Sequence, residues 1–79
     1  MASFLDITDD NTSYRVSKNP DGTIQLHCQG KISCIEIFSD GQALAAFCQE
    51  NTLNMNTFFS KLAQWDKPVA AQFAKGIYR

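Results

Sequence analysis

The sequence predicts a single α+β domain in which a three-stranded antiparallel β-meander precedes two or three short α-helices packed on one sheet face (βββααα). Three observations predict this class. Apolar and polar residues alternate through 13–38, the apolar spacing becomes helical after residue 39, and a chain of 79 residues has the length of one domain. We therefore divide the chain into an N-terminal segment, 1–12, a meander, 13–38, and a helical part, 39–79.

The N-terminal segment, 1–12, is acidic, with three aspartates and no basic residue. Phe4, Leu5 and Ile7 nevertheless give it apolar side chains to bury. We expect an irregular arm or a short edge strand.

The clearest local pattern is a β-hairpin over 13–29. Its turn is Asn19-Pro20-Asp21-Gly22, with proline at the second turn position and glycine suited to a positive φ. The strand that follows has an apolar face and a polar face, with Ile24, Leu26 and Cys28 on the first and Gln25, His27 and Gln29 on the second. We expect the apolar face to be buried and the polar face to meet solvent or a partner.

A third strand is predicted at 32–38, after a turn at Gly30-Lys31, because the segment is rich in β-branched residues. Its alternation is irregular, since Cys34 falls with Ile32 on one face and Ile35 with Ile37 on the other. This pattern indicates either a β-bulge or a sheet covered on both faces. Short connections favour antiparallel pairing throughout.

The first helix is predicted to start with a capping box formed by Ser39 and Gln42, with Asp40 in its first turn. Helical spacing of Leu44 and the residues after it predicts an end near Glu50 or Asn51. A polar stretch with poor helix propensity, 51–57, then predicts a break.

The second helix is expected over about 54–65, where Phe58, Phe59, Leu62 and Trp65 are the candidates for burial. A helix buries only one stripe, so if Phe58 is buried with Leu62, Phe59 or Trp65 should lie at the edge. Asp66 and Pro68 are typical of the start of a third helix, whose apolar face carries Val69, Phe73 and Ile77. We expect Gly76 to be the C-terminal cap of this helix.

Composition narrows the function classes. The formal net charge is −1 and the pI is about 5.6, so the chain lacks the basic excess typical of nucleic-acid binders. Three cysteines without a close framework argue against a disulfide scaffold. With neither a secretory signal nor a long apolar segment, we expect a cytoplasmic protein without membrane partners.

Catalytic chemistry has few candidates. His27 is the sole histidine, so a cysteine nucleophile would depend on it, and Cys34 on the neighbouring strand is the residue that could lie across from it. A Cys–His thiol enzyme is therefore one alternative. A zinc site needs about four ligands at short spacings, and no CxxC motif occurs. We expect no enzymatic activity, no metal and no cofactor.

A second alternative is a helix-turn-helix-like DNA-binding regulator. The second and third helices are joined by a short turn, and the third carries Lys67, Gln72 and Lys75 with Arg79 near its end. Its first turn, however, presents small apolar residues at 69–71, where base-contacting side chains usually lie. Nucleic-acid binding is thus the lesser expectation.

The leading hypothesis is a small protein-binding domain that modulates or inhibits a larger intracellular protein or complex. Stand-alone domains of this size often serve as adaptors or inhibitors, including antagonists of host machinery encoded by mobile elements or phages. Self-association as a homodimer remains possible, and an open sheet edge would suit strand addition. The candidate partner-binding residues are Tyr14 or Arg15, Gln25, His27, Gln29, Phe59 and Trp65.

Overall fold

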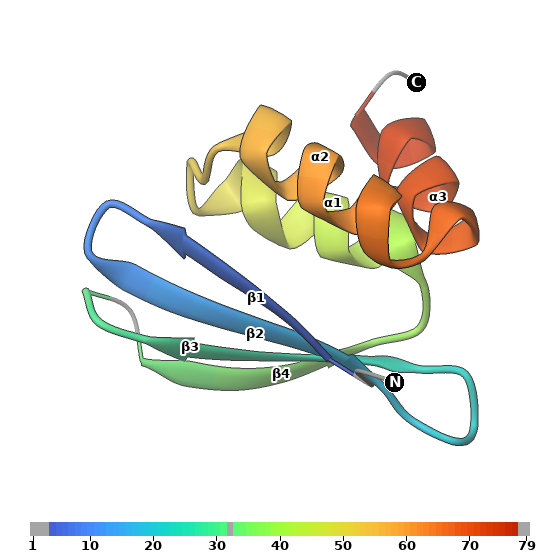
Figure 1. Cartoon of the computed structure of the whole chain (residues 1–79), viewed down its shortest axis with the longest axis horizontal. Coiled ribbons are helices and arrows are strands. Elements are labelled where there is room, and N and C mark those ends of the chain that lie inside the picture. The colour runs from blue at the N-terminus through green and yellow to red at the C-terminus, as the bar shows by residue number, and fades with distance from the viewer. Residues whose placement is uncertain (1–3, 32, 78–79) are drawn as a thin grey trace.

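The computed structural model describes residues 4–31 and 33–77. A four-stranded antiparallel sheet in the order β1-β2-β3-β4 is followed by three helices that lie on one of its faces (Figure 1). The elements are β1, Phe4–Asp9; β2, Thr12–Lys18; β3, Ile24–Gln29; β4, Cys34–Phe38; α1, Gly41–Glu50; α2, Met55–Trp65; and α3, Lys67–Ile77. The predicted α+β class is confirmed, with four strands in place of three.

The additional strand is β1, formed by the acidic N-terminal segment. Of the two expected forms, the edge strand is correct, because β1 pairs with β2 from Phe4 opposite Ser17 to Asp9 opposite Thr12. Asp10 and Asn11 connect the strands with φ angles of 51° and 60°. Two successive residues with positive φ are typical of the tight hairpin turns that suit the twist of paired strands, and Asp and Asn tolerate them well.

The predicted hairpin of β2 and β3 is confirmed. The backbone N–H of Gly22 donates to the carbonyl of Asn19 at 2.9 Å, and Gly22 has a φ of +90°. Asp21 accepts hydrogen bonds from the backbone and hydroxyl of Thr23, which lowers the pKa of this carboxyl. The turn therefore fixes the register that separates the two faces of β3.

The structure of β4 shows that both explanations offered for its irregular alternation are wrong. Cys34 to Phe38 pair with Cys28 to Ile24 in an unbroken register, so no bulge occurs along β4. Ile35 and Ile37 are not covered either, because they are 62% and 63% exposed. Ile32, the other residue in that pattern, lies outside the described residues.

The helix boundaries follow from side-chain caps. The carboxylate of Asp40 accepts from the backbone N–H of Ala43 at 3.1 Å, so Asp40 caps α1. The predicted capping box of Ser39 and Gln42 is wrong, because the cap is one residue later and Ala43 has no side-chain group to complete a box. Asn54 caps α2 through the N–H of Thr57, and Asp66 accepts from the N–H of Val69 at the start of α3. The expected break and third-helix start are confirmed.

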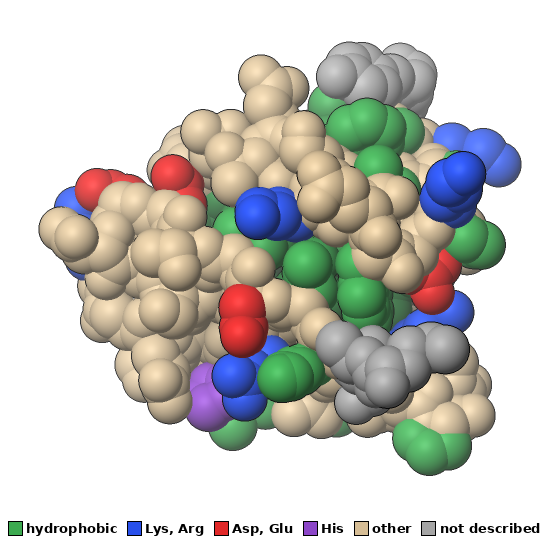
Figure 2. Space-filling model, in the orientation of Figure 1, with side chains coloured by type: hydrophobic (Ala, Val, Ile, Leu, Met, Phe, Trp, Pro, Cys, Tyr) green, Lys and Arg blue, Asp and Glu red, His purple; other side chains and the backbone are tan. Residues whose placement is uncertain are grey.

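The core lies between the sheet and the helices. Phe58 of α2 is at its centre, with the ring of Tyr14 5.2 Å away edge-on and the ring of Phe73 stacked at 6.4 Å. Figure 2 shows hydrophobic side chains in a strip between the sheet layer and the helical layer. The apolar face of the sheet is thus buried against the helices.

Gly76 is not the predicted C-terminal cap, because α3 continues to Ile77 and Gly76 is buried against α1. A Cβ built at this position would lie 2.7 Å from the Cβ of Ala45 and 3.0 Å from the carbonyl oxygen of Gln42. The missing side chain allows α1 and α3 to approach closely.

Candidate functional site

The face of the sheet opposite the helices is the candidate site, and we call it the open face. It carries alternate residues of every strand, since successive strand residues point to opposite sides. Its members are Phe4, Asp6 and Thr8 on β1; Ser13, Arg15 and Ser17 on β2; Gln25, His27 and Gln29 on β3; and Ile35 and Ile37 on β4.

The centre of the open face is a row of directly paired residues, in which Arg15 lies opposite Asp6 on one side and His27 on the other. The guanidinium of Arg15 donates from Nε to Asp6 Oδ1 at 2.9 Å and from a terminal nitrogen to Oδ2 at 3.3 Å. Its Cζ also lies 4.2 Å from the centre of the Phe4 ring. These contacts hold Arg15 in one orientation.

The ion pair also affects protonation. The hydrogen bond from Arg15 is the main cause that holds the pKa of Asp6 below its ordinary value. The same contact raises the pKa of the Arg15 guanidinium. The pair therefore stays fully charged at neutral pH and presents both signs on a solvent-exposed surface.

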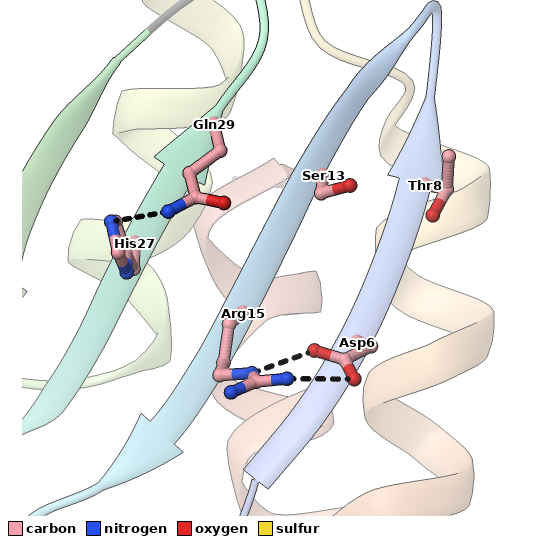
Figure 3. A pocket seen from close by; sticks show the side chains of 6 residues that line it. All are labelled: Asp6, Thr8, Ser13, Arg15, His27 and Gln29. Atoms are coloured by element: carbon pink, nitrogen blue, oxygen red, sulfur yellow. Dashed lines mark hydrogen bonds and ion pairs between the residues drawn. The ribbon is translucent and has the colours of Figure 1, made fainter.

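A shallow depression of about 370 Å³ lies over this row (Figure 3). Figure 3 shows its six lining side chains on one side of the sheet, with the helices behind. The side chains of Gln29 and His27 approach to 3.4 Å between their Nε2 atoms. The lining residues are Asp6, Thr8, Ser13, Arg15, His27 and Gln29. Such a polar hollow suits the side chains or backbone of a docked protein segment.

One margin of the open face is apolar. Ile35 pairs with His27 and Ile37 with Gln25, so both isoleucines lie beside the polar centre on the edge strand β4. Together with Phe59 they are the large hydrophobic side chains that remain exposed among the described residues. The open face therefore presents polar and apolar side chains side by side on one surface.

The structure brings together four of the predicted partner-binding residues, namely Arg15, Gln25, His27 and Gln29. It separates the others from them. Phe59 and Trp65 lie on α2, on the other side of the sheet, where Phe59 is 40% exposed and Trp65 packs partly against the core.

Tyr14 was an alternative to Arg15 for the exposed side of β2, and here the structure corrects the sequence analysis. Tyr14 is only 3% exposed because its side chain points toward the helices and packs on Phe58. Burial raises the pKa of its phenol.

Sequence reasoning missed seven of the eleven residues of the open face, namely Phe4, Asp6, Thr8, Ser13, Ser17, Ile35 and Ile37. Asp6, Thr8 and Ser13 line the depression, and the period-2 alternation through 4–8 was the signal that could have placed the first two. Ile35 and Ile37 gave no such signal, because apolar strand residues are usually buried.

The proposed Cys–His pair is not assembled. His27 lies on the open face, whereas Cys28 and Cys34 pair directly with each other on the helical side of the sheet. Burial raises the pKa of the Cys28 thiol to about 12, and it does the same for Cys48. These two thiols are therefore protonated at neutral pH and poor nucleophiles. Across 4–31 and 33–77, no group of three or more His, Cys, Asp or Glu residues is arranged to hold a metal ion.

The second and third helices form the expected helical pair, separated by Asp66 alone. Gln72, a candidate for the polar face of α3, is used within the fold, where its side-chain oxygen accepts from the backbone N–H of Gly41 at 2.9 Å. Lys67 and Lys75 are exposed on α3. The side of α3 that carries Gly76 packs against α1.

The fold and the open face define a small α+β domain with an uncovered antiparallel meander. Among the described helices, none has the length and apolar character that crossing a membrane requires. No protein-family model, curated protein or solved structure matches the chain.

Proposed function

We propose that this chain is a small non-enzymatic protein-binding domain that modulates or inhibits a larger protein, and that it binds this partner through the open face. The observation that carries the proposal is that two exposed isoleucines and an ion-paired arginine share the face that the helices leave uncovered, with His27 between Ile35 and Arg15. Ile35 and Ile37 are neighbours on the same face of β4, and contiguous exposed apolar side chains are typical of protein-interaction surfaces.

The chemistry of the open face supports this role. Arg15 is held by Asp6 and Phe4, so a partner that contacts it does not have to restrict a free side chain. Arginine is also enriched among residues that dominate binding energy.

The test is affinity capture from the native cell with matched variants, followed by binding measurements on the captured protein. Arg15→Glu and Ile35→Lys change the open face, whereas Lys75→Glu and Phe59→Lys make the same kinds of change on the helices. We expect both open-face variants to lose binding by about tenfold or more, as truncation of an interface anchor does, while the helix variants retain it. Circular dichroism and urea unfolding check that every variant folds.

Two outcomes would contradict the proposal. If Phe59→Lys abolishes capture and the open-face variants do not, the helical aromatic surface is the binding site. If no captured protein depends on the open face and random duplex DNA shifts the protein in a salt-dependent manner, the helix-turn-helix alternative is favoured.

A further inference from the structure

The two edge strands of the sheet, β1 and β4, have different neighbours. Helix α2 packs over β1, which also carries the paired Asp6, and α1 contacts β4, where the ring centres of Phe38 and Phe47 lie 5.5 Å apart. Strand β4 is the opposite edge, with β3 on one side and, among residues 4–31 and 33–77, no strand on the other (Figure 1). Its register with β3 is regular over Cys34–Phe38 and it contains no proline, so its outer backbone groups are in position to accept another strand.

The side chains of β4 indicate what such a strand would contain. Ile35 and Ile37 are exposed on the open face, and Glu36 is exposed on the helical side between them. No ion pair with Glu36 occurs among the described residues. Directly opposed residues of neighbouring strands favour opposite charges and apolar pairs. A complementary strand would therefore alternate apolar, basic and apolar residues.

A second copy of the chain fits this edge poorly. In an antiparallel pair of β4 strands related by a two-fold axis, the register that places Ile35 opposite Ile37 also places Glu36 opposite Glu36. In the two neighbouring registers Glu36 lies opposite Cys34 or Phe38 and gains no opposite charge. Like charges in direct opposition are destabilising. The charge of β4 thus favours a different protein over self-pairing.

We propose that β4 accepts an extended segment of a partner protein as a fifth strand, with Lys or Arg opposite Glu36 and apolar residues opposite Ile35 and Ile37. This inference rests on the proposed protein-binding function and narrows it to strand addition. The backbone pairing supplies attachment, and Glu36 selects the charge of the partner.

The test uses two synthetic peptides with capped ends, Ser-Thr-Val-Lys-Val-Thr-Ser and the same sequence with Glu in place of Lys. Each is titrated into the 15N-labelled full chain, and amide shifts are followed by NMR. We expect the lysine peptide to perturb the amides of Cys34–Phe38 most strongly. We also expect it to bind roughly fivefold more tightly than the glutamate peptide, as one cross-strand charge pair allows.

The charge exchange provides the control. Glu36→Lys should reverse the preference between the two peptides, whereas Glu50→Lys, the same change at the exposed end of α1, should leave it unaltered. Circular dichroism confirms that both variants fold. A reversal in the first variant alone supports strand addition at Glu36.

Strand addition is overturned by any of three results: neither peptide perturbs β4, the preference does not reverse in Glu36→Lys, or sedimentation shows the wild-type chain dimerising through β4. These results leave the broader function separately testable. Both peptides could fail to bind while a captured partner still depends on Arg15 and Ile35. In that case binding through the open face is supported and only the addition of a fifth strand is contradicted.

Discussion

Ile35 of β4 lies directly opposite His27 of β3, on the face of the sheet away from the helices. This pairing joins the apolar margin to the polar row of Asp6 and Arg15 in one continuous surface. The proposed function depends on this continuity, because it gives a partner both apolar contact and directed polar groups.

The first prediction compares two isoleucines on opposite faces. Ile24 is 1% exposed beneath the helices, whereas Ile35 is 62% exposed. Ile24→Ala should lower the free energy of unfolding by about 2–5 kcal/mol through lost burial and a cavity. Ile35→Ala should lower it by less than about 1 kcal/mol, the span of strand propensity. Urea unfolding measures both, and equal losses would mean that the open face is covered.

The second prediction concerns the close approach of α1 and α3. Gly76→Ala should destabilise the fold, because overpacking against Ala45 costs about 1–3 kcal/mol and outweighs the roughly 1 kcal/mol gained in helix propensity. In a double-mutant cycle, Ala45→Gly should recover part of that loss. Strictly additive effects of the two substitutions would show that the two helices do not meet there.

The third prediction distinguishes the observed cap from the one expected from sequence. Asp40→Ala should cost about 1 kcal/mol, because the N–H of Ala43 loses its acceptor. Asp40→Asn should restore most of that stability, and Ser39→Ala should have little effect. Thermal unfolding of the three variants measures these effects. A larger loss of stability in Ser39→Ala than in Asp40→Ala would mean that Ser39 is the N-cap of α1.

These cases show which features of the structure can be predicted from the sequence. Turn residues and periodicity were enough for the β2–β3 hairpin and the helix order, because local chemistry determines them. Adjacent cap candidates such as Ser39 and Asp40 differ by one residue, and tertiary packing decides between them. Gly76 resembled a cap because glycine is common after helices, whereas its actual role depends on contact with Ala45 from another helix.

The candidate site was predictable only in part. The polar face of β3 followed from strict alternation, so Gln25, His27 and Gln29 were placed together correctly. Ile35 and Ile37 were not, because a sequence pattern does not reveal which apolar residues a fold leaves uncovered. The exposed isoleucines needed the layer arrangement, in which all three helices lie on one face.

The fourth prediction concerns alkaline pH. Burial raises the pKa of Cys28 and of Cys48 to about 12, from an ordinary value of 9.0. Their contribution to stability is complete below pH 9 and falls as pH rises toward 12, because the unfolded thiols ionise first. At pH 10 the ionisation of each thiol in the unfolded state should lower the free energy of unfolding by about 1.4 kcal/mol relative to neutral pH.

Urea unfolding under reducing conditions at pH 7.5, 9 and 10 measures this fall. The variant with Cys28→Val and Cys48→Ala serves as the comparison, because other alkaline groups such as Tyr14 titrate in both proteins. Wild type should lose more stability than the variant between pH 9 and 10. Parallel losses would mean that the two thiols are accessible to solvent.

The most direct test of the central claim is NMR cross-saturation from a protonated, captured partner into the deuterated domain. If the partner binds through the open face, saturation spreads to the amides of the sheet, is strongest around Arg15, His27 and Ile35, and leaves α2 and α3 unaffected. Saturation concentrated on α2 and α3, around Phe59 and Lys75, with the strands unaffected, would contradict it.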